Sequence, residues 1–153
     1  MIGLNSEIKQ ALNEIDFVKR YEDLSNEYND LKTPMELRLD VIDIEEVIDT
    51  IRDLGYKAEF INKEKYFHVE DIKIKEYSFS CNIVLYGGMV DLVWIVRKNE
   101  ELILGSPWGT YSKKLINPKY RIKKPIFGTY EDLEKILQNS FVMFEDFKKA
   151  LIR

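Results

Sequence analysis

The sequence predicts an α+β fold, in which N-terminal and C-terminal helices pack on an antiparallel β meander of about five strands. Two observations predict it. Near both ends of the chain apolar residues recur every three or four positions, which is the period of an amphipathic helix. Between these ends, residues 56–104 alternate apolar and polar side chains and are rich in β-branched and aromatic residues. Helices, then strands, then helices indicate an α+β architecture.

The chain has 153 residues, of which 45% are hydrophobic and 33% are charged. These values predict one soluble domain over residues 1–153 and exclude a disordered or fibrous protein. No apolar run approaches the roughly 20 residues that span a membrane. The first residues also lack the basic and apolar regions of a signal peptide. We therefore expect a cytoplasmic protein that makes no membrane contact.

The first predicted element is a long amphipathic helix over residues 6–32, which Thr33-Pro34 closes. Two alternatives stay open for it. The helix could break near Ser25-Asn26, and its stripe could form the seam of a coiled-coil homodimer instead of packing in the chain's own core. The apolar stripe consists of Ile8, Leu12, Ile15, Val18, Tyr21, Leu24, Tyr28 and Leu31.

Residues 34–41 fit two patterns. Apolar and charged residues alternate from Met35 to Val41, which favours a strand. Thr33 as a cap, Pro34 at the first position and Glu36 at the third favour the start of a helix. We favour the helix, and the strand remains the alternative.

A second helix is predicted over residues 43–54. Asp43 is a good N-cap, and Gly55 follows the last apolar position. One face of this helix is apolar, and the opposite face is acidic. The acidic face consists of Glu45, Glu46, Asp49 and Asp53.

The period then changes to two, and five strands follow. The dipeptide Gly87-Gly88 is a strong hairpin signal, because both central residues of a primed turn need a positive φ. Consecutive hairpins of this kind produce an antiparallel meander. The predicted strands cover residues 56–61, 66–74, 77–86, 89–97 and 101–104.

The last predicted helix covers residues 129–151. Thr129 and Asp132 form a capping box at its start, and Asn139-Ser140 could kink it or split it in two. A loop rich in glycine and proline precedes it, over residues 105–111, and leads into a basic connection.

The sequence contains no motif that indicates an enzyme, a metal site or a cofactor. His68 and Glu70 share one face of a predicted strand, but no second histidine or nucleophile motif accompanies them. Cys81 shares one face of a predicted strand with Phe79 and Ile83, which is typical of a small buried side chain. We therefore predict that the protein is not an enzyme and needs no cofactor or metal.

Charge is distributed unevenly along the chain. Residues 1–55 have a balance of −8, residues 56–130 a balance of +5, and the whole chain has a net charge of −4. This pattern suggests two alternative binding surfaces. One is the acidic helix face, with Trp108 and Tyr111 as apolar anchors for a protein partner; the alternative for Trp108 is a lid over the core of the sheet. The other is a basic segment that could hold nucleic acid or another polyanion, although the net charge argues against it: Lys113, Lys114, Lys119, Arg121, Lys123 and Lys124.

From Tyr86-Gly87-Gly88-Met89 through Gly105-Ser106-Pro107-Trp108 and on to the segment 145–151, the chain resembles the small immunity proteins of bacterial polymorphic toxin systems. The resemblance covers most of residues 42–152. It implies a single α+β domain that binds and blocks a cognate toxin, often a nuclease, in the cell that makes the toxin. It also implies that the acidic helix face or the Trp108 loop contacts that partner.

Overall fold

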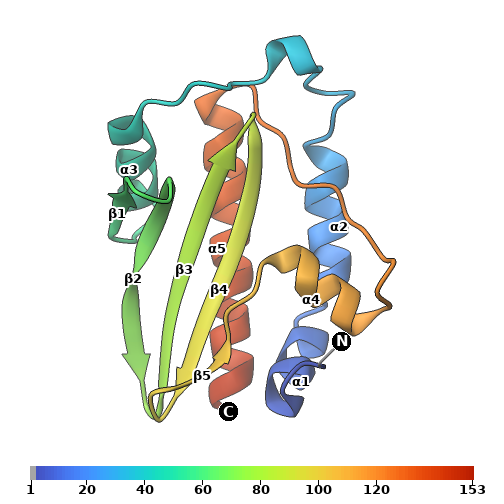
Figure 1. The fold of residues 1–153 in the computed structure, drawn as a ribbon, viewed down its shortest axis with the longest axis vertical. Coiled ribbons are helices and arrows are strands. Elements are labelled where there is room, and N and C mark those ends of the chain that lie inside the picture. The colour runs from blue at the N-terminus through green and yellow to red at the C-terminus, as the bar shows by residue number, and fades with distance from the viewer. Residues whose placement is uncertain (1–2) are drawn as a thin grey trace.

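Five antiparallel strands form one sheet in the computed structural model, which describes residues 3–153 (Figure 1). The strands lie in the order β1-β2-β3-β4-β5, so that each pairs with its neighbour in the chain. The predicted α+β meander with helices at both ends is therefore confirmed. The elements are α1 (Ser6–Glu14), α2 (Phe17–Glu27), the 3-10 turn η1 (Met35–Leu37), α3 (Ile44–Asp53), β1 (Ala58–Ile61), β2 (Tyr66–Ile74), β3 (Tyr77–Tyr86), β4 (Met89–Lys98), β5 (Glu101–Leu104), α4 (Trp108–Leu115) and α5 (Tyr130–Ile152).

The β3–β4 hairpin sets the register of the two longest strands. Tyr86 pairs with Met89 across a two-residue turn, and the turn residues Gly87 and Gly88 have φ values of 57° and 73°. Only glycine adopts such angles without cost, so the predicted Gly-Gly turn is confirmed.

The core lies between the sheet and the helices. In Figure 1 α5 runs behind β3 and β4, with α1 and α2 beside it. Trp94 of β4 stacks on Phe144 and Phe147 of α5, with ring centroids 5.2 and 4.9 Å apart. All three side chains are at most 1% exposed. This aromatic contact joins the centre of the sheet to the long C-terminal helix.

The single helix expected over residues 6–32 is instead two helices. The break is at Asp16, whose φ of 58° and ψ of 47° are left-handed, and not at Ser25-Asn26. Phe17 is 1% exposed, whereas Val18 is only half-buried. The buried stripe thus steps from Ile15 to Phe17, a spacing of two that no continuous helix can place on one face. The second helix also ends at Glu27.

Residues 34–41 form neither the favoured helix nor the alternative strand. Only Met35–Leu37 make one 3-10 turn, and the chain is extended at Arg38. Met35 and Leu37 are 72% and 62% exposed, so their alternation with charged residues does not mark a buried face.

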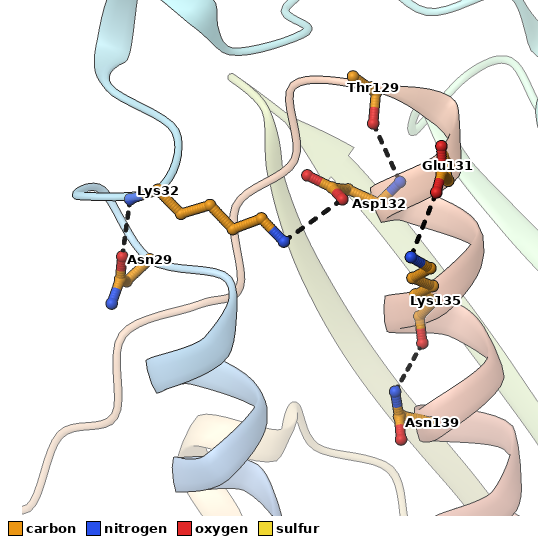
Figure 2. Close-up of polar contacts among 7 residues, drawn as sticks. All are labelled: Asn29, Lys32, Thr129, Glu131, Asp132, Lys135 and Asn139. Carbon is orange, nitrogen blue, oxygen red and sulfur yellow. Dashed lines mark hydrogen bonds and ion pairs between the residues drawn. The ribbon is translucent and has the colours of Figure 1, made fainter.

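Helix α5 begins after Thr129 as predicted, with one of the two bonds of a capping box, and continues without a break past Asn139 (Figure 2). Thr129 Oγ1 accepts the backbone N–H of Asp132 at 3.0 Å. The Asn139 side chain donates to the carbonyl of Lys135 at 2.9 Å, one turn back. This polar side chain therefore bonds within the helix instead of splitting it. Figure 2 also shows Lys32 reaching Asp132 at 3.6 Å, which links the end of the first helical region to α5.

Candidate functional site

The acidic face of α3 is exposed. Glu45, Glu46, Asp49 and Asp53 all lie in solvent. Asp49 pairs with Arg52 at 3.0 Å, but both side chains are more than half exposed, and such pairs are weak. The other three carboxylates form no ion pair within residues 3–153. The described chain therefore leaves most of this negative charge uncompensated.

The opposite face of α3 is fixed to the rest of the fold. Val47 and Ile51 are fully buried, and Figure 1 shows α3 beside β1 at one edge of the sheet. The Asp43 carboxylate accepts the backbone N–H of Glu45 at 3.0 Å, as expected for an N-cap. The Asp43 backbone N–H donates to the hydroxyl of Tyr130 at 2.8 Å. The acidic residues therefore stand on a helix that is anchored to both the sheet and α5.

The expectation that Trp108 and Tyr111 are apolar anchors for a partner needs correction. Both belong to α4, although the glycine and proline residues of this segment predicted a loop. Trp108 and Tyr111 are 1% and 0% exposed. Trp108 packs edge-on against Trp94 and Phe17, with centroids 5.2 Å apart in both pairs. These two residues cover the core of the chain and do not face solvent.

The basic segment does not form a continuous stripe. Four of its six cations line one cavity of about 550 Å³, between α4, the start of β4 and the loop before α5. Lys114 and Lys119 do not line it. We name this cavity the basic cavity; its cations from the segment are Lys113, Arg121, Lys123 and Lys124.

Arg38 is a fifth cation of the basic cavity, and the sequence analysis did not identify it. Its stem crosses the β3–β4 turn so closely that a Cβ built on Gly88 would lie 2.6 Å from the Arg38 Cβ. Gly128 permits a second close approach, because a Cβ there would lie 2.6 Å from the carbonyl oxygen of Leu37. The sequence shows both glycines, but it does not show that Leu37 and Arg38 pack against them.

Asp91 is a half-buried carboxylate that also lines the basic cavity. Burial raises the pKa of Asp91, and the charge of Lys124 and the hydrogen bond from the backbone N–H of Leu92 act in the opposite direction. The cavity therefore combines five cations with this carboxylate and with Asp30.

The histidine lies half-buried on β2, and the cysteine is buried on β3. His68 Nδ1 lies 2.7 Å from Asn82 Oδ1, and its Nε2 lies 3.4 Å from Asp71. The bulge between Val69 and Ile72 changes the pairing register just beyond His68. The described contacts join His68 to Asn82 and Asp71, and none joins it to Glu70, which shares its face of the predicted strand. Burial raises the pKa of the Cys81 thiol to about 12, so it stays protonated at neutral pH.

The apolar stripe of α1 and α2 packs in the hydrophobic core of the chain. Ile8 and Leu12 are fully buried, and Phe17, Tyr21, Leu24 and Tyr28 are at most 4% exposed. The stripe therefore packs in the chain's own core, and these side chains are not free to form the alternative coiled-coil seam. Leu31 is 89% exposed, but it lies beyond the end of α2.

The chain matches no protein-family model, no curated protein and no solved structure. Within residues 3–153, no group of three or more His, Cys, Asp and Glu side chains is arranged to hold a metal ion. In the same part of the chain, no helix combines the length and apolar character that crossing a membrane requires.

Proposed function

We propose that the protein is a non-catalytic, immunity-type inhibitor that binds a cognate bacterial toxin through the acidic face of α3. One observation carries this proposal: an anchored helix presents four exposed carboxylates, of which only Asp49 has an ion-pair partner in the described chain. Carboxylates on a rigid support attract a cationic protein surface and orient it during association.

The position of Asp53 supports a role outside helix stability. Glu45 and Glu46 lie in the first turn of α3, where negative charge stabilises a helix. Asp53 is the last residue of α3, where negative charge opposes the helix dipole. Its charge therefore costs stability at this end of the helix, and a partner that needs the charge explains the position.

Reversal of charge at Asp49 and Asp53 tests the proposal. The partner is first isolated as a stoichiometric band that co-purifies with the tagged protein, and its toxicity is assayed with and without the inhibitor. The double variant Asp49→Lys/Asp53→Lys should associate at least about tenfold more slowly at low salt and should protect less well against the toxin.

The control variant carries the same change in net charge away from α3. Glu27→Lys/Glu101→Lys alters two exposed residues in α2 and β5 that form no ion pair in the described chain. Its association rate should stay within about twofold of the wild-type rate. If both double variants slow association equally, general electrostatic attraction explains the result and the α3 assignment is wrong.

A further inference from the structure

The basic cavity holds positive charge that the chain leaves largely unpaired. Of its five cations, only Lys123 forms an ion pair in the described chain, with Asp30 at 3.8 Å. Arg38, Arg121 and Lys124 form none, and neither does Lys113. With Asp30 and Asp91 both ionised, the lining has a formal charge of +3. Like charges repel one another, so gathering them here without partners costs stability unless an anion joins them.

Arg38, which lines this cavity, also has an unsatisfied donor. Its Nε atom is buried and has no hydrogen-bond partner in the described chain. A buried donor without a partner is costly, and native proteins contain few of them. The close approach to Gly88 holds the stem of this side chain in place. Arg38 lines the basic cavity together with the four cations of the basic segment.

We propose that the basic cavity binds a phosphorylated small molecule of the nucleoside diphosphate class. Its volume of about 550 Å³ falls in the usual range for small-molecule sites. A terminal diphosphate carries about three negative charges at neutral pH, which matches the lining. Arginine forks and lysine ammonium groups are the side chains that recognise phosphate oxygens. Tyr120 lines the same cavity and offers an aromatic ring to a base.

A compact ligand fits this arrangement better than a nucleic-acid strand does. Proteins that bind single strands present a cationic groove that follows the backbone over several nucleotides. Here all five cations line one cavity, and Arg121, Lys123 and Lys124 also line its neighbour. Arg38 reaches the basic cavity from a part of the chain remote from residues 113–124. Lys114 and Lys119 would extend such a groove, but they do not line the cavity. This site is independent of the acidic face of α3.

Calorimetric titration with adenosine 5′-diphosphate, at about 0.15 M salt, tests the proposal. The wild-type protein should bind one equivalent. Arg38→Gln and Lys124→Gln should each weaken binding at least about tenfold, because each removes a charged contact to phosphate. Lys124 is exposed, so Lys124→Gln keeps the test valid even if the Arg38 variant unfolds. The matched controls Lys114→Gln and Lys119→Gln should bind as the wild-type protein does.

Three results would overturn the proposal. The first is no heat of binding at millimolar adenosine 5′-diphosphate. The second is equal weakening by the control and cavity variants, which would reduce the effect to overall charge. The third is a single-stranded oligonucleotide that binds more tightly than the diphosphate and loses affinity equally with Lys119→Gln and Lys124→Gln. That outcome would assign the segment to a nucleic-acid strand instead.

Discussion

The Tyr111 hydroxyl forms hydrogen bonds with the backbone of Trp94, at a point on the edge of β4 where β5 does not pair. β5 pairs with β4 from Val96 onward, and Pro107 bridges Val93. At Trp94, between these two contacts, the backbone N–H donates to the Tyr111 hydroxyl at 3.1 Å, and that hydroxyl donates to the Trp94 carbonyl at 2.9 Å. Burial raises the pKa of Tyr111 well above its usual value, so the hydroxyl stays protonated and can donate.

Replacement of this hydroxyl should destabilise the protein without changing its shape. Tyr111→Phe keeps the ring and leaves two buried backbone groups unsatisfied, which should lower the free energy of unfolding by about 1–3 kcal/mol. Urea unfolding followed by tryptophan fluorescence measures the loss. Tyr86→Phe is the control, because Tyr86 is 75% exposed and should change stability by less than about 0.5 kcal/mol. Equal stability of the two variants would show that the Tyr111 hydrogen bonds contribute nothing.

At the scale of elements, the sequence predicts those whose pattern is local. The β meander follows from alternation and turn residues, and α3 follows from Asp43 and Gly55 at its ends. The break at Asp16 follows from the burial of Phe17 in place of Val18. The sequence does not show this break, because Val18 also fits a single periodic stripe. Helix α4 is short and begins directly after Pro107, within a segment whose glycine and proline residues indicate a loop.

The β4–β5 turn contains a strained residue that can be relieved. Lys98 pairs with Glu101, and the two turn residues between them, Asn99 and Glu100, have φ values of 49° and 71°. Asparagine tolerates this region, but glutamate has a Cβ that clashes with its own backbone there. Glu100→Gly creates the preferred Asn-Gly turn and should stabilise the protein by about 1 kcal/mol.

Thermal unfolding checks this prediction. The melting temperature of Glu100→Gly should rise by about 2–4 °C for a chain of this size. Glu101→Gly changes composition identically one residue later, inside β5, where glycine costs about 0.5–1 kcal/mol. The two variants should therefore shift the melting temperature in opposite directions. A fall with Glu100→Gly would show that the turn does not strain this residue.

Across the whole molecule, part of the acidic N-terminal third pairs with the basic middle of the chain. The Glu7 carboxylate of α1 pairs with Lys98 Nζ of β4 at 3.1 Å, and the Asp30 carboxylate pairs with Lys123 Nζ at 3.8 Å. The acidic face of α3 and most of the basic cavity are left out of this pairing. Charge counting could therefore predict both candidate surfaces from the sequence. It could not predict Arg38, or the burial of Trp108, because each depends on contacts between distant segments.

Two carboxylates link elements of the fold and make its stability depend on pH. The pKa of Glu7 is lowered chiefly by the hydrogen bond from Tyr77 at 2.7 Å; burial opposes this effect and Lys98 adds to it. Burial acts to raise the pKa of Glu145, but the hydrogen bonds from Lys148 and Tyr56 outweigh it, and the pKa is lowered. Lys148 itself is only 3% exposed and lies 2.9 Å from Glu145.

Because both pKa values are lower in the folded protein than in the unfolded chain, protons bind the unfolded chain more readily. Their contribution to stability is complete above the unfolded pKa, near 4.5, and is lost as the pH falls through the folded values. The double variant Glu7→Gln/Glu145→Gln should melt about 2–6 °C below the wild-type protein at pH 7 and approach it near pH 3. The control Glu27→Gln/Glu134→Gln changes two exposed, unpaired carboxylates and should keep the wild-type slope. If the two double variants lose melting temperature in parallel with the wild-type protein from pH 6 to pH 3, other groups control the acid limit of stability.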